Sequence, residues 1–77
     1  MTDEEVAILK HLGDKLRFYR IQKGYSQEVF ADKTELDRTY ISGLERGKRN
    51  PSYLIIKRIA NTLDIQEQQL FQDEVKK

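Results

Sequence analysis

The chain has 77 residues, with 14 Lys and Arg against 13 Asp and Glu, and its formal net charge is +1. A single domain of this size buries only about 60% of the surface that its unfolded chain exposes, so a partner would help to stabilise it. The absence of Cys excludes disulfides and thiolate metal sites, and no apolar run is long enough for a signal peptide or a membrane span. A soluble cytoplasmic protein is expected.

The charges are distributed in blocks along the chain. Residues 10–25 carry a net +4 and residues 38–58 a net +5, whereas the segments 1–9, 26–37 and 59–77 are acidic. One interpretation is the solvated surface of a helical domain. The other is that the denser basic block binds a polyanion.

Apolar residues recur at helical spacing along the whole chain, and no segment alternates as a half-buried strand would. Turn signals divide this pattern into five helices, predicted at about 4–22, 27–34, 38–46, 53–62 and 66–72. The prediction is therefore an all-α fold, with a frayed tail, DEVKK, after the fifth helix. Its core is predicted from the inward positions of the helices: Leu9, Leu12, Leu16, Tyr19, Phe30, Ala31, Leu36, Ile41, Leu44, Ile56, Ile59, Leu63 and Leu70.

The helix at 4–22 carries no catalytic pattern. The acidic residues at its start, Asp3, Glu4 and Glu5, suit the positive end of the helix dipole better than they suit a catalytic pair. His11 is the only histidine and falls on the outer side of this helix, where we expect it to be solvated. Because the chain also lacks a Gly-rich phosphate loop and a nucleophile–base arrangement, we predict no enzyme, no cofactor, no metal site and no small-molecule ligand.

The next three helices have recognisable starts. Ser26, Asp37 and Ser52 stand at the N-cap positions of the helices at 27–34, 38–46 and 53–62. Tyr25 and Leu36, which precede the first two caps, are predicted to pack against the fourth residue of each helix as hydrophobic staples. Two stapled and capped starts so close together predict short helices with closely fixed entry angles.

The helix at 38–46 presents two different faces when it is viewed along its axis. At about 100° per residue, Ile41 and Leu44 point inward. The opposite face has no carboxylate and consists of Arg38, Thr39, Ser42, Gly43 and Arg46. Arg can pair bidentately with guanine, and Thr or Ser can bond base edges or touch a thymine methyl, so this face suits the major groove of DNA. A solvated face is the alternative, although such faces usually mix both signs of charge.

Gly43 is an unusual residue for the interior of this helix, because Gly there costs roughly 1 kcal/mol relative to Ala. Its outward direction argues against packing on another helix. We therefore expect the bare backbone at Gly43 to approach a neighbouring surface closely, and a DNA groove is such a surface.

The run from Gln27 to Leu44 resembles the helix-turn-helix of the phage-repressor-like (lambda repressor and Cro, Xre-type) DNA-binding family. Ala31 stands where that motif needs a small residue. The segments YRIQKGYSQ, LERGKRNPS and LDIQEQQLF match the wider family pattern in register, and LDRTYISGLERGKRN looks most like the controller proteins of restriction–modification systems. The resemblance implies a compact five-helix domain, here one domain over residues 1–77 with its core at about 9–72 after a short acidic extension.

The same resemblance implies a transcriptional regulator that binds a palindromic double-stranded DNA operator as a homodimer. Arg38, Thr39 and Ser42 would contact bases. The residues implied to contact the DNA backbone are Gln27, Tyr40, Arg46, Lys48, Arg49, Asn50 and, from the first helix, Arg17. Gly43 falls where several relatives place a base-reading side chain, so base contacts are expected mainly in the N-terminal half of the third helix, with DNA bending supplying further specificity.

Two further positions follow from the resemblance. Arg20 and Glu45 border the apolar stripes of the first and third helices, and the family commonly joins these positions by a structural ion pair; a phosphate contact by Arg20 is the alternative. Glu35 stands at the turn position that is usually Gly or Asn, where φ is positive. Some backbone strain is therefore expected at Glu35.

The C-terminal part carries more apolar residues than one core-facing stripe can bury. Leu54 and Ile55 lie beside the inward positions of the fourth helix, and Ile65 and Phe71 belong to a short fifth segment with little core left to cover. These four residues are predicted to form the dimer interface.

An antitoxin-type or other protein-interaction regulator with the same fold is the alternative function. Such a protein would usually carry an extra segment that wraps its partner. RNA is a weaker candidate because the basic face lacks an aromatic platform for unpaired bases. A salt-dependent shift of duplex DNA in a gel would separate DNA binding from these alternatives.

Overall fold

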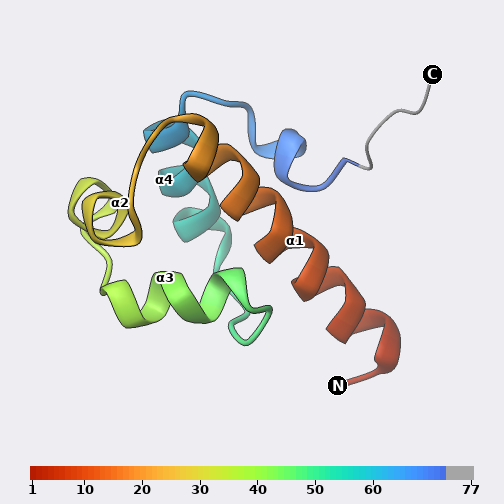
Figure 1. Ribbon diagram of the computed structural model, residues 1–77. Helices are drawn as coiled ribbons and strands as arrows, with labels where there is room; N and C mark the ends of the chain where they lie inside the picture. The colour runs from red at the N-terminus through yellow and green to blue at the C-terminus, as the bar shows by residue number, and fades with distance from the viewer. Residues whose placement is uncertain (73–77) are drawn as a thin grey trace.

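Four α-helices and one 3-10 turn make up the described part of the chain, residues 1–72 of this computed structural model. They are α1 (Asp3–Gln22), α2 (Gln27–Thr34), α3 (Arg38–Glu45), α4 (Tyr53–Leu63) and η1 (Glu67–Leu70). No strand occurs in these 72 residues, which confirms the all-α prediction. In Figure 1, α3 and η1 lie on opposite sides of the long helix α1. The tail predicted to fray, residues 73–77, lies outside the described residues.

The helix starts are largely those predicted. Ser26 and Ser52 each accept a hydrogen bond from the backbone N–H three residues ahead, at 3.0 and 3.2 Å. Asp37 is a correction: it occupies the N-cap position in an extended conformation, but its side chain makes no capping hydrogen bond. α1 has a reciprocal cap that we did not predict, in which the Thr2 hydroxyl and the Glu5 carboxylate each bond the other's backbone N–H.

The fifth helix was predicted wrongly in its type. The segment at 66–72 forms only the 3-10 turn η1, and the hydrogen bonds that cap its start are local. The Gln66 N–H donates to the Gln69 side chain at 3.0 Å, and the Gln68 amide donates to the Gln66 side chain at 2.9 Å. A segment of four residues cannot offset the cost of nucleating an α-helix, so the tighter turn is favoured.

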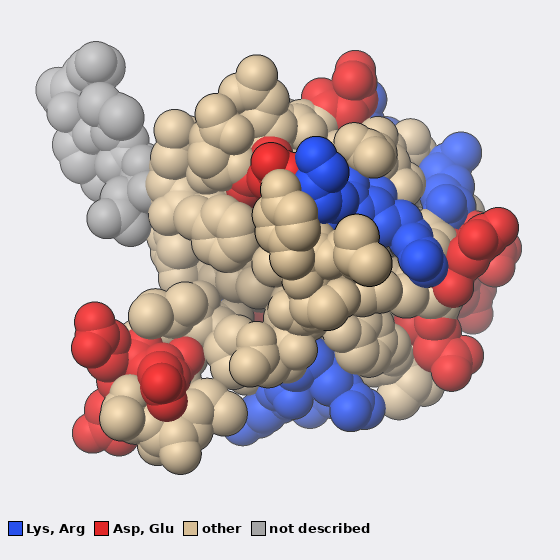
Figure 2. All heavy atoms as spheres, turned by 180° about the vertical axis from the view of Figure 1, so that it is seen from behind, with Lys and Arg blue, Asp and Glu red and all other residues tan. Residues whose placement is uncertain are grey.

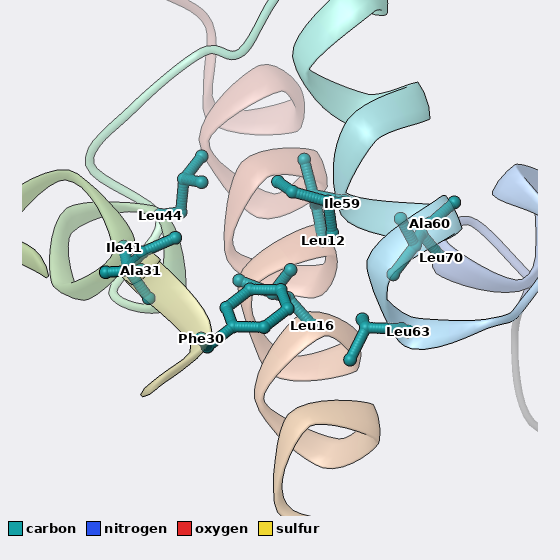
Figure 3. Packing of buried hydrophobic residues seen from close by; sticks show 10 residues of the cluster. All are labelled: Leu12, Leu16, Phe30, Ala31, Ile41, Leu44, Ile59, Ala60, Leu63 and Leu70. Carbon is teal, nitrogen blue, oxygen red and sulfur yellow. The ribbon is translucent and has the colours of Figure 1, made fainter. Parts of the chain in front are cut away.

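The core gathers side chains from all four α-helices and from η1 (Figure 3). Its members are Leu12, Leu16, Phe30, Ala31, Ile41, Leu44, Ile59, Ala60, Leu63 and Leu70, and all but Ala60 were predicted core residues. Tyr19, Leu36 and Ile56 were predicted to be in the core but are only partly buried at its edge. Leu9 is half-buried and lies outside the cluster, because the first turns of α1 extend beyond the other helices.

Thr34 is a polar member of the interior that the sequence pattern did not reveal. It is fully buried, and its hydroxyl donates to the backbone carbonyls of Phe30 and Ala31, which are 2.8 and 3.1 Å away. Burying the Thr34 hydroxyl therefore costs little folding free energy, since the hydroxyl is hydrogen-bonded within its own helix. The staple predicted ahead of α2 is present as well, with the Tyr25 and Phe30 rings stacked at 6.3 Å between centroids.

α1 and α3 cross at Gly13, where their backbones come into close approach. A Cβ on Gly13 would lie 2.7 Å from the Glu45 carbonyl oxygen, which is too short for any side chain. The loop after α3 also lies directly on α1, because a Cβ on Gly47 would be 2.9 Å from the Lys10 Cα. These contacts fix the position of α3 relative to α1.

The turn between α2 and α3 contains the positive φ that was expected. Glu35 has φ 60° and ψ 35°, a left-handed conformation. The N–H of Leu36 donates to the Ala31 carbonyl at 3.0 Å, which closes the end of α2. The side chain of Glu35 is exposed, so the strain is a property of the backbone.

Replacing Glu35 with Gly is expected to be neutral or to stabilise the domain by up to about 1 kcal/mol, because Gly adopts this conformation without a Cβ clash. The same change at Glu28, whose backbone is helical, should instead cost about 0.5–1 kcal/mol. Thermal unfolding of the two variants makes the comparison. A drop in melting temperature at Glu35 as large as that at Glu28 would contradict the assignment of strain.

Candidate nucleic-acid interface

The exposed face of α3 carries the residues predicted to contact bases. Arg38 and Thr39 are exposed and Ser42 is half-buried, whereas Ile41 and Leu44 lie in the core. The loop that follows α3 continues this surface with Arg46, Lys48, Arg49 and Asn50, all of them exposed. In Figure 1, α3 lies at the lower left of the ribbon, away from α4 and η1.

α3 and its loop carry four cations, Arg38, Arg46, Lys48 and Arg49. Figure 2 shows Lys and Arg side chains along the lower edge of the molecule and a second group in its upper half, with acidic side chains at the N-terminal end of α1. The two cations of α4 make contacts within the domain instead. Arg58 donates to the Thr34 carbonyl at 3.2 Å, and Lys57 pairs with Glu67 at 3.1 Å. The hydrogen bond with Glu67, together with its charge, raises the pKa of Lys57.

Arg20 and Glu45 form a buried ion pair between α1 and α3. The Nε and Nη2 atoms of Arg20 donate to the two carboxylate oxygens of Glu45 at 2.5 and 3.0 Å, and Nη1 donates to the Tyr25 carbonyl at 2.8 Å. Arg20 is 8% exposed and Glu45 is 6% exposed. This burial speaks against the alternative in which Arg20 contacts a phosphate.

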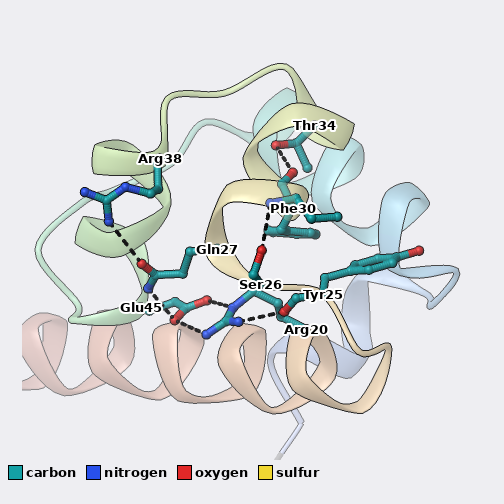
Figure 4. A network of polar contacts seen from close by, with 9 residues as sticks. Arg20, Tyr25, Ser26, Gln27, Phe30, Thr34, Arg38 and Glu45 are labelled. Carbon is teal, nitrogen blue, oxygen red and sulfur yellow. Dashed lines mark hydrogen bonds and ion pairs between the residues drawn. The ribbon is translucent and has the colours of Figure 1, made fainter.

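The ion pair extends to the surface through Gln27, as Figure 4 shows. The side-chain amide of Gln27 donates to Glu45 Oε1 at 3.1 Å, and its carbonyl oxygen accepts from Arg38 Nη1 at 3.4 Å. Gln27, the first residue of α2, therefore links the buried pair to the exposed guanidinium of Arg38. The sequence suggested Gln27 and Arg38 separately and did not reveal this contact.

An open groove separates α1 from α3. Four of its lining residues, Arg17, Gln27, Ser42 and Arg46, were predicted to contact DNA. Its other lining residues are Lys10, Asp14 and Glu45. Lys10 is paired with Asp14 at 2.7 Å, an exposed contact one turn along α1. In the sequence, the helical spacing that places Lys10 and Arg17 on the same outer side of α1 could have indicated that Lys10 belongs to this groove. The exposed guanidinium groups of Arg17, on α1, and Arg46, at the end of α3, lie on opposite sides of this groove.

The expectation that the backbone at Gly43 is open to a DNA groove was wrong. Gly43 is buried, and the side chain that covers it belongs to Arg49. The Cγ and Nε atoms of Arg49 lie 3.0 Å from the position that a Cβ on Gly43 would take. The end-on projection of α3 gave the direction of Gly43 correctly, but it could not show that the following loop folds back over this residue. The bare backbone at Gly43 is therefore not open to a DNA groove.

The comparison with known families agrees with this arrangement. A helix-turn-helix family model matches residues 16–70, a span that includes α2, α3 and α4. The chain belongs to the helix-turn-helix family. Members of this family are DNA-binding transcriptional regulators rather than enzymes, and the resemblance found in the sequence is confirmed at this level.

Relatives of this helix-turn-helix protein include controllers of restriction–modification systems. The chain is 45% identical over 62 residues to the control protein C.MunI of Mycoplasma, and the match covers 79% of this chain and 84% of the relative. The crystal structure of the controller C.AhdI from Aeromonas hydrophila superimposes with a TM-score of 0.82 at 46% identity, covering 84% of this chain and 98% of the other. SinR, solved in complex with DNA, aligns with a TM-score of 0.76 at 31% identity, covering 79% and 98%.

The described part of this helix-turn-helix protein contains neither a metal-binding cluster nor a membrane-spanning helix. In residues 1–72, no group of three or more His, Asp and Glu side chains is arranged to hold a metal ion. No helix in the same range is long and apolar enough to cross a membrane.

Proposed function

We propose that residues 1–77 act as one DNA-binding domain that works as a restriction–modification controller, binding a palindromic operator as a homodimer through α3. One observation supports this most directly. Between residues 38 and 50 the chain has four cations and a single acidic residue, Glu45. Because Glu45 is buried against Arg20, residues 38–50 expose no carboxylate that would repel phosphates. The high identity to controller proteins supports the finer assignment.

In this proposal the residues divide by the part of DNA that they contact. Arg38, Thr39 and Ser42 reach base edges, because α3 fits the major groove with its N-terminal half innermost. The residues that hold the sugar–phosphate backbone are Arg17, Gln27, Tyr40, Arg46, Lys48, Arg49 and Asn50. The α1–α3 groove, with Arg17 and Arg46 at its sides, suits one phosphate strand.

The proposed dimer interface lies on α4 and the C-terminal segment. Leu54 is 76% exposed and Phe71 is 47% exposed, so both leave apolar surface for a partner. Ile55 and Ile65 are partly buried against the core and can contribute only their remaining surface. Because η1 lies across α1 from α3, a contact between copies there leaves both recognition helices free. Two-fold symmetry would then place half-site centres about 34 Å apart.

Replacing Arg38 with Ala is expected to cost about 1–3 kcal/mol of binding on the selected operator and to relax preference at one position per half-site. Replacing Arg49 with Ala should weaken binding to all sequences alike and reduce the salt slope by about one unit per subunit. The operator comes from selecting bound sites out of random duplex DNA. Titrations of both variants with the selected and with random duplexes at several salt concentrations then measure the affinities and their salt slopes.

Equal losses for Arg38→Ala on selected and random DNA would refute its role in base reading. A wild-type protein that shifts no duplex DNA at low salt would refute the proposed function as a whole. That result would leave the protein-interaction alternative, because the basic surface would then have no polyanion to bind.

A further inference from the structure

Arg49 lies along α3 in the free domain instead of extending from its loop into solvent. Its Cγ and Nε atoms are each 3.0 Å, and its Cδ atom 3.5 Å, from the position of a Cβ on Gly43. The carbon of its guanidinium group is 5.6 Å from the centroid of the Tyr40 ring. The side chain therefore crosses Gly43 and ends over Tyr40, one turn towards the N-terminus of α3.

The loop is anchored at the same residue. The N–H of Lys48 donates to the Gly43 carbonyl at 2.8 Å, which holds the backbone next to Arg49 against the end of α3. The Tyr40 ring is itself partly buried against the core, so the aromatic face under the guanidinium is fixed. Gly43 and Tyr40 together form what we call the Gly43–Tyr40 surface. Any side chain at position 43 would occupy the space that the Arg49 stem now fills.

We propose that Gly43 is a positioning residue for DNA binding, which acts by leaving room for Arg49 on the Gly43–Tyr40 surface. This inference rests on the proposed function and adds a residue to it. A guanidinium on an exposed loop would lose much side-chain freedom on contacting DNA, and holding it against α3 beforehand removes part of that loss. Gly43 thus affects affinity through Arg49 and not through a contact of its own.

The test compares Gly43→Leu and Gly43→Ala in the wild type and in an Arg49→Ala background. Leu and Ala both favour a helix more than Gly does, so the melting temperatures should stay the same or rise. Gly43→Leu should weaken operator binding about tenfold, the loss expected for one charge-assisted contact. Gly43→Ala should have a smaller effect, because Arg49 then needs to move by only a few tenths of an ångström. In the Arg49→Ala background, Gly43→Leu should cause no further loss.

Lys48→Ala provides the matched control, since it removes the neighbouring loop cation but not the Lys48 backbone contact. The effects of Gly43→Leu and Lys48→Ala should add, whereas those of Gly43→Leu and Arg49→Ala should not. An undiminished loss for Gly43→Leu in the Arg49→Ala background would overturn the proposal, because Gly43 would then meet DNA directly. Unchanged binding by Gly43→Leu in the wild type would also overturn it.

A measurement without DNA separates this inference from the proposed function. Nuclear Overhauser contacts between the Arg49 side chain and the Tyr40 ring should be present in the free wild-type domain and absent in Gly43→Leu. Their absence in the wild type would refute the placement of Arg49 even if DNA binding is found. Their presence in a protein that binds no DNA would mean that the proposed function had failed while the placement of Arg49 was correct.

Discussion

Replacing Arg20 with Ala is expected to destabilise the domain by about 3–5 kcal/mol, a large part of the 5–15 kcal/mol that typically holds a domain together. The variant leaves the Glu45 carboxylate buried without its two charged hydrogen bonds. It also leaves the Tyr25 carbonyl without its donor. This loss of stability comes from the charge left buried without a partner. It does not measure the net contribution of the intact ion pair to stability, which is modest because both ions had to be desolvated.

Urea or thermal unfolding measures this loss, and three further variants make the result specific. Glu45→Ala should destabilise by a similar amount, and the double variant should lose less than the sum of the two. Arg20→Lys should lie between wild type and Arg20→Ala, because an ammonium cannot reproduce the bidentate fork and the bond to Tyr25. If Arg20→Ala kept full stability but lost DNA affinity, Arg20 would be a phosphate contact after all.

Local chemistry explains why the helix starts could be predicted from the sequence. A cap such as Ser26 or Ser52 bonds a backbone N–H only three residues away, so its effect needs no knowledge of the rest of the fold. The burial of Ile41 and Leu44 followed in the same way from their spacing on one side of a short helix. The positive φ at Glu35 and the pairing of Arg20 with Glu45 came from the family resemblance, because neither is visible in composition or spacing.

The features that the sequence did not reveal depend on contacts between distant segments. Nothing near Gly13 distinguishes it from a glycine that merely weakens a helix, since its role is set by the backbone of α3 at Glu45. Gly43 was misjudged for the same reason, because the loop that bears Arg49 returns over it. The helix type of η1 also could not be predicted from the sequence. Leu70 was predicted to be buried from the apolar pattern, but whether its segment forms an α-helix or a 3-10 turn depends on the surface beneath it.

Replacing Phe71 with Asp is expected to abolish the proposed dimer and to weaken operator binding by about 10²–10⁴-fold, the usual gain from linking two binding sites. The reason is the cost of placing a carboxylate in the proposed apolar interface, which also includes Leu54, the most exposed apolar residue of α4. Because Phe71 is 47% exposed in the single copy, the variant monomer should keep its helices. Circular dichroism tests that retention.

Sedimentation at micromolar concentration, with and without operator DNA, is the decisive measurement for this variant. Val29→Asp is the matched control, since Val29 is 43% exposed but lies on α2 and is not part of the proposed interface, and its variant should still form dimers. If the interface lies on α4 and the C-terminal segment, only Phe71→Asp shifts the protein to monomers, and its remaining DNA binding follows single half-sites. A wild-type protein that sediments as a monomer both free and on DNA would end the dimer model. The contacts proposed for α3 would then have to supply the whole affinity from one half-site.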